Sequence, residues 1–475
     1  MPRLVQIRPP APRRGSAPAR AASRGTAYVE TYGCQMNEAE SDLVRAQLER
    51  AGYRIVQDPG QADVVLLNTC AVRERAEARV LGRTTQLLAH RATRPDQVIG
   101  LLGCMAEHLR EKIAERAPHI GLVVGPDAYR RIGDLVDEAR AGRRVLDVAL
   151  DRNEVYAGLD ELHGAVPLRA NVTIQRGCDK FCTFCVVPFT RGRERSVPPG
   201  EVLRRVRAAV EGGAKEIVLL GQTVNSYRHE DVTFADLVRA VARTDGVLRV
   251  RFTSPYPVDF SDDLIEVLAT EPAVCPQVHL PLQSGSDAVL DRMKRGYRRD
   301  DFLALVERLR AAVDGICLST DVMVGFCGET EADHRATLAT MEAVRFDTAF
   351  CFAYSDRAIT YASKKLADDV PEAVKKRRLS EVLALQDRHT KDSLARRHGR
   401  TIEVLVDGPA RRKDRLLGRC RHFWNVLLPL DSAAPGDLVR ARVTGSTGRA
   451  LLAEPLSPRL ASDEDAPPSP TVHDV

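Results

Sequence analysis

The chain has 475 residues, of which 44% are hydrophobic, and a formal net charge of +5. This length exceeds what a single hydrophobic core ordinarily supports, so several domains are expected. No apolar run approaches the roughly 20 residues of a membrane-spanning helix, and no secretory segment precedes the 11 cysteines. These features exclude an integral membrane protein, argue against a disulfide framework, and predict a soluble, cytoplasmic protein.

Positive charge is concentrated at the two ends of the chain. Residues 1–29 hold six Arg and no acidic residue, and residues 396–449 hold twelve Lys or Arg against five acidic residues. The remainder is therefore net acidic, and a polyanion should prefer the ends. Residues 1–24 and 458–475 lack apolar periodicity, which predicts a disordered arm and a disordered tail. An Arg-rich organelle transit peptide is the alternative for the arm.

Residues 25–145 are predicted to form an α/β domain. Three strand-like runs, 27–32, 63–69 and 97–103, are each followed by a helical pattern. Such alternation is typical of a parallel sheet, and we expect a flavodoxin-like arrangement.

Three cysteines occupy equivalent positions in this domain. Cys34, Cys70 and Cys104 each come at the carboxyl end of a predicted strand. If these strands adopt the order 2-1-3, neighbouring strands lie about 4.8 Å apart and the three thiols open into one crevice. Such a crevice can hold a metal cluster, whereas the alternative is three coincidental core cysteines.

Residues 146–168 form a predicted linker, and residues 169–395 resume the alternation of strands and helices. Strand-like runs at β/α spacing predict a partial or complete β/α barrel, followed by a basic helix at 372–398. The predicted strands are 171–175, 216–220, 248–253, 277–282, 316–324 and 348–354.

The strongest chemical signal is a cysteine triad directly after the first barrel strand. Cys178, Cys182 and Cys185 have the spacing Cys-x3-Cys-x2-Cys and lie at the mouth where such barrels carry their chemistry. Zinc usually takes four protein ligands, whereas three thiolates on a four-iron cluster leave one iron open to chelate a substrate. Three structural cysteines or a zinc knuckle are the alternatives.

The segment around this triad, residues 176–192 (RGCDKFCTFCVVPFTRG), closely resembles the cluster loop of the tRNA methylthiotransferases, the MiaB-type enzymes. The resemblance extends over residues 26–456 and includes the contexts of Cys34, Cys70 and Cys104 and the segments 219–225, 279–286 and 325–330. The chain departs from the family pattern at Cys327, where proline is usual, and at 355–363, which lacks the usual Pro and Gly.

This resemblance implies a radical enzyme with two 4Fe-4S clusters. Its product would be the 2-methylthio derivative of N6-isopentenyl(dimethylallyl)adenosine at tRNA position 37, next to the anticodon, and no side chain would act as catalytic acid or base. The ligands of the cluster that cleaves S-adenosylmethionine would be Cys178, Cys182 and Cys185, and those of the auxiliary, sulfur-supplying cluster would be Cys34, Cys70 and Cys104.

Five further residues are expected to contact the cofactor. Phe184 would flank the adenine of S-adenosylmethionine, or alternatively pack inside the barrel. Side chains on loops after barrel strands can hold polar groups of a cofactor or substrate, and here they are Gln222, Asn225, Gln283 and Ser284.

Residues 396–457 are predicted to form a small β-barrel that resembles the TRAM module of RNA-modifying enzymes. Short strand-like runs at 401–406, 424–428, 438–443 and 450–453 are separated by Gly, Pro and Asp. Arg419 and Arg421 beside Trp424 suit phosphate contact and base stacking. The alternative is a solvated basic surface with Trp424 in the core.

Other substrates and another class of protein remain open. A methylthiotransferase acting on threonylcarbamoyl-adenosine in tRNA, or on a ribosomal-protein aspartate, is the nearest alternative, although Lys180, Phe181 and 186–188 favour the isopentenyl branch. A non-enzymatic zinc and RNA-binding protein is the alternative from another class. The expected partners are tRNA carrying isopentenyladenosine, an electron donor such as flavodoxin or ferredoxin, and sulfur- or cluster-supply proteins, with no membrane and a monomeric chain.

Overall fold

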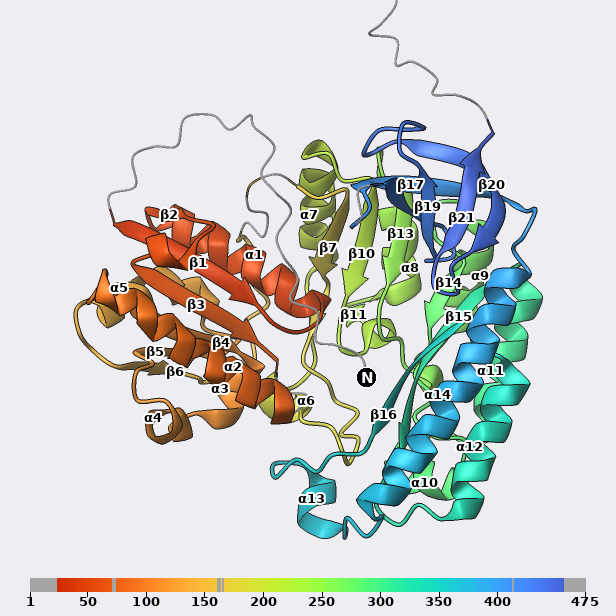
Figure 1. The fold of residues 1–475 in the computed structure, drawn as a ribbon, viewed down its shortest axis with the longest axis horizontal. Coiled ribbons are helices and arrows are strands. Elements are labelled where there is room, and N and C mark those ends of the chain that lie inside the picture. The colour runs from red at the N-terminus through yellow and green to blue at the C-terminus, as the bar shows by residue number, and fades with distance from the viewer. Residues whose placement is uncertain (1–23, 71–73, 160–163, 165, 412–413, 457–475) are drawn as a thin grey trace, which may run out of the picture. The chain divides into compact units, whose positions relative to one another are not determined.

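The computed structural model describes residues 24–70, 74–159, 164, 166–411 and 414–456 (Figure 1). The predicted arm, except Arg24, and the predicted tail lie outside these residues. By its internal contacts the chain divides into two compact units, one ending at Leu385 and the other beginning at Gln386.

The N-terminal part of the first unit is a parallel sheet in the order β2-β1-β3-β4-β5-β6. Its described strands are β1 (Gly25–Thr31), β2 (Tyr53–Ile55), β3 (Val64–Thr69), β4 (Val98–Gly103), β5 (Leu122–Val124) and β6 (Val145–Asp147). Its described α-helices are α1 (Gln35–Arg50), α2 (Glu74–Leu87), α3 (Cys104–Leu109), α4 (Lys112–Arg116) and α5 (Ile132–Arg140).

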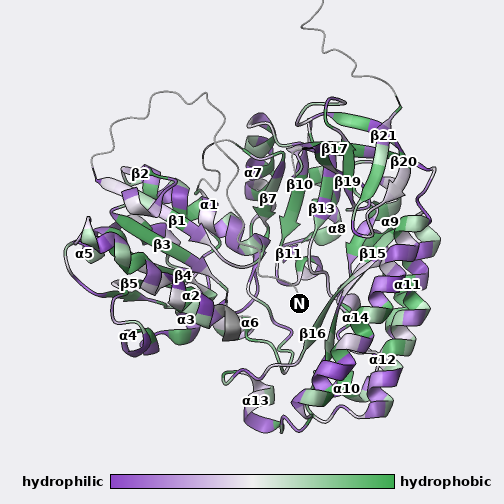
Figure 2. Ribbon diagram, viewed as in Figure 1, coloured by the Kyte–Doolittle hydropathy of each residue, from purple (hydrophilic) through white to green (hydrophobic). Residues whose placement is uncertain are grey.

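The strands of this sheet separate two hydrophobic layers. Along β3, Val64 and Leu66 pack with α1 and α5, whereas Val65 and Leu67 pack with α2 and α3. Because successive strand residues point to opposite faces, a sheet covered on both faces requires an uninterrupted apolar run. Figure 2 shows the corresponding hydrophobic strands between helices that are hydrophilic on their outer surfaces.

The strand order corrects one expectation. The predicted order placed the run 27–32 in the centre, but β3 lies between β1 and β4. The reason is β2, a short strand after α1 that pairs with residues 25–27 and occupies the other side of β1. With β2 counted, the order is the flavodoxin-like 2-1-3-4-5, so the expected fold is confirmed and its switch point lies between β1 and β3.

The described residues of the predicted linker pack against neighbouring elements. Tyr156 is buried, and its ring stacks on Tyr129 with 6.1 Å between centroids. Its hydroxyl donates to the carbonyl of Pro126, and the guanidinium of Arg176 lies 4.5 Å from its ring centroid. The segment therefore joins the N-terminal sheet to the first barrel strands through specific contacts.

The six predicted strands of the barrel region are confirmed. They form two parallel sheets, β13-β10-β7 and β14-β15-β16, which a parallel bridge between Val250 and Val274 connects. One hydrophobic core includes residues of both sheets and of the covering helices, as in a partial β/α barrel. The strands are β7 (Arg169–Thr173), β10 (Glu216–Leu220), β13 (Arg249–Phe252), β14 (Gln277–His279), β15 (Cys317–Val324) and β16 (Thr348–Ala353).

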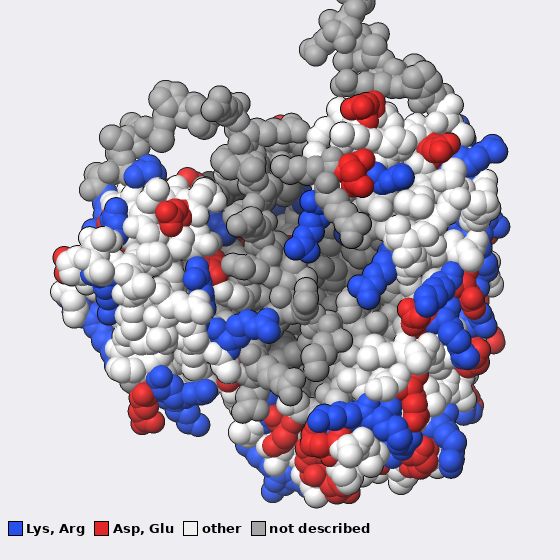
Figure 3. Space-filling model, viewed as in Figure 1, with Lys and Arg blue, Asp and Glu red and all other residues white. Residues whose placement is uncertain are grey.

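The helices of this region follow the strands along the chain. Their outer faces carry intermixed charges, as Figure 3 shows over α12 and α14, where Arg377 bonds Glu331 and Glu381 at 2.7 Å each. None of the described helices combines the length and apolar character needed to cross a membrane. The helices are α7 (Pro199–Glu211), α8 (Phe234–Ala242), α9 (Asp262–Thr270), α10 (Asp287–Arg292), α11 (Arg299–Ala312), α12 (Glu331–Val344), α13 (Tyr361–Lys365) and α14 (Glu372–Ala395).

The second unit contains a closed barrel in the order β17-β18-β19-β21-β20. All four predicted runs overlap strands, and β18 is an additional strand that the sequence analysis missed. The strands are β17 (Thr401–Pro409), β18 (Arg415–Cys420), β19 (Asn425–Pro429), β20 (Leu438–Ser446) and β21 (Leu451–Pro455).

Candidate active site

The loop with Cys178, Cys182 and Cys185 follows the carboxyl end of β7. Its base is closed by antiparallel pairing of β8 (Gln175–Arg176) with β9 (Arg195–Ser196). Gly177 has φ +75°, and a Cβ at this position would lie 2.1 Å from the carbonyl oxygen of Arg193. Only glycine fits this close approach, so it fixes where the cysteine loop begins.

The thiols of Cys178, Cys182 and Cys185 lie near one another. Burial, together with the neighbouring Cys182 and Cys178 thiols, raises the pKa of the Cys185 thiol to about 12. Burial also raises the pKa of the Cys178 thiol, whose sulfur lies 3.2 Å from the hydroxyl of Thr223. The backbone amide of Val187 donates to Cys185 Sγ over 3.5 Å. The triad thus shares one partly buried place at the barrel mouth.

The sulfur of Cys182 has a buried arginine as its neighbour. Arg295 Nη1 donates to Cys182 Sγ over 3.2 Å. The Arg295 guanidinium lies 4.7 Å from the ring centroid of Tyr256 and 5.3 Å from that of Tyr297. Aromatic faces attract a cation, so the two rings hold this donor against the triad.

The second triad lies at the carboxyl ends of three adjacent strands. Cys34 precedes α1, Cys70 directly follows β3, and Cys104 is the first residue of α3 after β4. A Cβ at Gly33 would lie 3.0 Å from Cys70 Cβ, which places Cys70 beside the residue before Cys34. Asn37 Oδ1 accepts from the Cys34 amide over 3.3 Å. The strand ends therefore gather this triad, although the strand order differs from the expected one.

One arginine of the cysteine loop reaches the second triad. Arg191 Nε donates to Cys104 Sγ over 3.1 Å, and its two Nη atoms contact the Glu40 carboxylate at 2.5 and 3.0 Å. Burial raises the pKa of the Cys104 thiol, while Arg191 opposes this shift and Glu40 and Cys34 add to it. Cys104 also packs against Val186, the residue after the first triad. The two triads are therefore neighbours within one unit.

Two observations bear on whether the residues around the triads fit iron-sulfur clusters and S-adenosylmethionine. Across the described ranges, no group of three His, Cys, Asp or Glu side chains is placed to hold a single metal ion. The thiolates of a cubane cluster bind different irons, so that arrangement is not required of them. At the same mouth, Gln222 Oε1 is buried and has no hydrogen-bond partner among the described residues. A bound polar cofactor would satisfy it, so the residues present fit such a group.

Phe184 is half-buried at the mouth. Its ring meets Phe326 edge to face, with 6.3 Å between centroids, and it borders the cluster that contains Met293 and Cys327. This contact agrees with the alternative that Phe184 packs in the barrel, and it leaves the expected adenine contact a prediction.

Two other expected cofactor contacts stay predictions, and both side chains already have partners within the chain. The Asn225 amide is occupied by the backbone of Tyr256, at 2.6 and 2.9 Å. Ser284 is fully buried, and its hydroxyl lies 3.3 Å from that of Thr337. Both contacts hold loops that follow barrel strands in place. Gln283 has φ +67°, and its backbone donates to the Asp321 carbonyl and accepts from the Met323 amide, each over 2.8 Å, so its backbone is fixed against β15.

The expected RNA contacts of the C-terminal barrel are corrected in one respect. Trp424 is only 5% exposed, and its open face is limited further by Arg397, 5.6 Å from the ring centroid. The preceding residue, Phe423, is 42% exposed and has φ +70°. The Arg419 guanidinium lies 4.2 Å from the Phe423 ring centroid, and Arg421 is half-exposed in the same turn. The exposed aromatic beside the expected basic residues is therefore Phe423, because the tight turn directs Trp424 inward.

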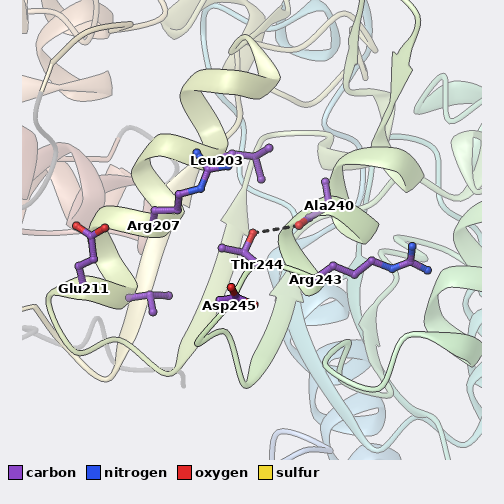
Figure 4. A pocket seen from close by; sticks show the side chains of 8 residues that line it. Leu203, Arg207, Glu211, Ala240, Arg243, Thr244 and Asp245 are labelled. Atoms are coloured by element: carbon purple, nitrogen blue, oxygen red, sulfur yellow. Dashed lines mark hydrogen bonds between the residues drawn. The ribbon is translucent and has the colours of Figure 1, made fainter.

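A pocket on the outer side of the barrel region is unrelated to either triad. Figure 4 shows its lining, which comes from α7, α8 and the segment after α8. Thr244 donates to the Ala240 carbonyl over 3.0 Å, and Arg243 is paired with Glu271 at 2.6 Å. This pocket holds no cysteine, and its lining does not include the carboxyl ends of the barrel strands, so it is not the candidate site.

The sequence analysis missed several residues that complete the candidate site. Thr223 lay within a segment used for the resemblance, and a hydroxyl directly after Gln222 was an available signal. Arg191 lay within the cysteine segment 176–192 but was assigned no role. Arg295 and Glu40 had no local signal, because their partners lie 113 and 151 residues away.

Comparison with known families assigns each part of the chain. Residues 26–125 match the uncharacterized protein family UPF0004, residues 172–341 match the radical SAM superfamily, and residues 395–456 match the TRAM domain. The radical S-adenosylmethionine methyltransferase TsrM from Kitasatospora setae, solved with cobalamin and a 4Fe-4S cluster, has a similar fold. It is 16% identical, with a TM-score of 0.56 over 72% of this chain and 77% of that chain.

Sequence relatives extend over nearly the whole chain. The tRNA-2-methylthio-N(6)-dimethylallyladenosine synthase of Chloroherpeton thalassium is 42% identical over 437 residues, which cover 90% of this chain and 96% of the relative. The protein of the same name from Chlorobium luteolum is 44% identical over 427 residues, covering 89% and 96%. This chain therefore belongs to the family of the tRNA-2-methylthio-N(6)-dimethylallyladenosine synthases, enzymes of the radical SAM superfamily.

Proposed function

We propose that this chain converts N6-isopentenyladenosine, next to the anticodon of tRNA, to its 2-methylthio derivative. Relatives at 42% and 44% identity carry the name of this activity, which favours it over the threonylcarbamoyl-adenosine and ribosomal-protein alternatives. Two 4Fe-4S clusters and S-adenosylmethionine would supply the radical and the sulfur when bound. The proposed ligands are Cys178, Cys182 and Cys185 for the first cluster and Cys34, Cys70 and Cys104 for the second.

The observation that carries this proposal is the adjacency of the two triads. Cys104 of the second triad packs against Val186, which directly follows Cys185 of the first triad. Hydrogen removal and sulfur transfer must act on the same carbon of one base, so both centres have to reach one small volume. The contacts of Cys104 with Val186 and Arg191 link the two triads within one unit, which supports this requirement.

The other residues of the mouth would position the reactants. Thr223 and Arg295 contact sulfurs of the first triad, and Gln222 presents an unsatisfied acceptor oxygen to a polar cofactor. Phe184 adds an apolar wall against Phe326 that helps to exclude water. These groups bind and orient, and none is required as an acid or base.

The C-terminal barrel would bind the tRNA. Phe423 offers an exposed ring for a base, and Arg419 and Arg421 offer charge for phosphate. We further propose that the chain acts as a cytoplasmic monomer and receives electrons from a flavodoxin or ferredoxin and sulfur or clusters from supply proteins. The family resemblance supports these partners.

Nucleoside analysis tests the substrate. The chain, expressed in a strain that makes isopentenyladenosine but lacks the 2-methylthio group, should restore 2-methylthio-isopentenyladenosine in digested tRNA. A matched strain without isopentenyladenosine should yield no product. Methylthiolation of threonylcarbamoyl-adenosine alone would contradict the proposal and favour the nearest alternative.

Purified protein tests the two proposed sites. Replacing Cys178, Cys182 and Cys185 by alanine should abolish reductive cleavage of S-adenosylmethionine. Replacing Cys34, Cys70 and Cys104 should keep cleavage, abolish sulfur insertion, and leave about half of the reconstituted iron, because each triad serves one cluster. Iron equal to that of the unmodified chain in the second variant would refute the auxiliary site.

A further inference from the structure

Arg191 belongs to the loop of the first triad but makes its contacts with the second. It follows Cys185 by six residues and lies at the end of α6 (Val187–Thr190). Its Nε atom donates to Cys104 Sγ over 3.1 Å, and its Nη1 and Nη2 atoms meet Glu40 Oε1 and Oε2 at 2.5 and 3.0 Å. Each nitrogen of this guanidinium thus has a partner in the N-terminal domain.

Burial strengthens the electrostatic interaction of the Arg191 charge with its neighbours. The side chains of Arg191 and Glu40 are 5% and 2% exposed. A guanidinium removed from water is tolerated only when it is paired and hydrogen-bonded. Glu40 pairs with the Nη side, and the remaining Nε proton is directed at the Cys104 sulfur. A bidentate carboxylate fixes the guanidinium plane, so Glu40 sets the direction of the bond to sulfur.

We propose that Arg191 is a positioning residue of the auxiliary cluster, where its hydrogen bond to Cys104 raises the reduction potential of the cluster and slows its loss. The inference rests on the proposed function, because it takes Cys104 as a cluster ligand. Hydrogen bonds to cluster sulfurs and nearby positive charge stabilise the more negative, reduced state. Glu40 acts in the opposite electrostatic sense, since its negative charge disfavours reduction.

This arrangement couples the two sites through one loop. The segment from Cys178 to Arg191 would bind the first cluster through its cysteines. Its final residue, Arg191, would set the reduction potential of the second cluster. Val186, between these groups, packs against Cys104 and keeps the loop in place. A movement of the loop that binds the first cluster would therefore also move Arg191 relative to the second cluster.

Redox titration of the reconstituted full chain, followed by electron paramagnetic resonance, tests the inference. Arg191→Gln should lower the midpoint potential of the auxiliary cluster, because it removes the positive charge and the Nε donor to Cys104. Glu40→Gln should raise that potential, because it removes the opposing negative charge. The double variant should fall between the two. A purely structural ion pair would lower stability in both single variants without shifts of opposite sign.

Two nearby arginines serve as controls. Arg193 is exposed and bonds Asp179 at 2.6 Å, so Arg193→Gln should leave the potential unchanged. Arg195 is buried, bonds Asp127 at 2.8 Å and donates to the Arg191 backbone carbonyl over 2.9 Å without contacting a cysteine. Arg195→Gln therefore reproduces the loss of a buried ion pair and of a backbone contact to Arg191, without removing the donor to sulfur. Comparable shifts in Arg195→Gln and Arg191→Gln would overturn the proposal.

Cluster retention gives a second readout. Iron release to a chelator should be several-fold faster from Arg191→Gln than from the unmodified chain. Arg191→Lys keeps the charge, but a compact ammonium cannot contact both Glu40 and Cys104 as a guanidinium does. Arg191→Lys should therefore keep a midpoint potential close to that of the unmodified chain and still release iron faster. This variant also tests the proposal if Arg191→Gln does not fold.

The full chain with Cys178, Cys182 and Cys185 replaced by alanine assigns the auxiliary signal. If this variant binds no iron, the auxiliary site fails, and the proposed function fails with it. If it binds iron and Arg191→Gln leaves both the midpoint potential and the release rate unchanged, the role of Arg191 alone is overturned.

Discussion

Phe423 and Trp424 are adjacent residues with opposite surroundings, and they predict opposite effects of substitution. Phe423→Ala should weaken tRNA binding by about 1 to 3 kcal/mol and leave the barrel folded, because an exposed ring is available for stacking. Phe423→Tyr keeps the ring and should bind normally. Binding titrations and far-UV circular dichroism measure the two properties.

Trp424→Ala should instead destabilise the C-terminal barrel by about 3 to 5 kcal/mol, the usual cost of truncating a large buried aromatic residue. Unfolding followed by circular dichroism is required, since Trp424 is the only tryptophan of the chain. A stable Trp424→Ala barrel that has lost tRNA affinity would restore the original stacking hypothesis.

Glu107 on α3 predicts a pH dependence of stability. Burial raises the pKa of its carboxyl to about 7, against the opposing effect of Arg110. The unfolded carboxyl ionises near pH 4.5, so the folded state loses stability as pH rises from about 4.5 to about 7. That loss reaches at most about 3 kcal/mol. Glu107→Gln should remove it, so the variant should gain stability over the unmodified apo chain at pH 8 but not at pH 4.

Denaturant titrations at both pH values measure this difference. An advantage of Glu107→Gln that is equal at pH 4 and pH 8 would show that ionisation of Glu107 is not its cause.

The cysteines were predictable residue by residue, whereas their polar neighbours were not. Cys34, Cys70 and Cys104 follow apolar runs, and the ends of parallel strands meet at one edge. Arg191 and Glu40 meet across 151 residues of sequence, and only the packing of the domains specifies that contact.

The hairpin of β8 and β9 is the element that positions the cysteine loop, and Gly177 is its tightest point. Gly177→Ala should distort the loop, because φ is +75° and the added Cβ would meet the Arg193 carbonyl at 2.1 Å. We expect loss of iron from the first site only. Iron content and S-adenosylmethionine cleavage measure it, and Gly213→Ala, with φ +103° and no atom within 4 Å, is a control for backbone strain alone.

Elements with long apolar runs were predicted, and those without them were missed. β3 and β4 of the N-terminal sheet are buried at every position, and apolar residues make up most of both strands. β2 has three residues and owes its pairing to β1. β18 places buried Leu416, Gly418 and Cys420 opposite Arg415 and Arg419, and its apolar face is too small to stand out beside the basic residues. Tertiary pairing therefore specifies both missed strands.

At the scale of the whole molecule, the closed C-terminal barrel should be separable from cluster binding. Deleting residues 400–475 should weaken tRNA binding and leave the iron content unchanged, since both triads lie in the unit that ends at Leu385. The logarithm of affinity should fall by about 0.7 per phosphate contact for each tenfold rise in salt, and the deletion should flatten this slope. An unchanged slope would show that the barrel is not the tRNA-binding part.

The N-terminal domain and the β/α-barrel region differ from the C-terminal barrel in whether evolution can exchange them separately. The barrel region contributes buried Arg176, Arg191 and Arg195, and the N-terminal domain contributes buried Asp127 and Glu40 that pair with them. A protein made from only one of these two parts would carry unpaired charges on a surface that is buried in the full chain. Recombination can therefore add or remove the C-terminal barrel as a cassette, whereas the two cysteine-bearing halves have to be exchanged as one piece.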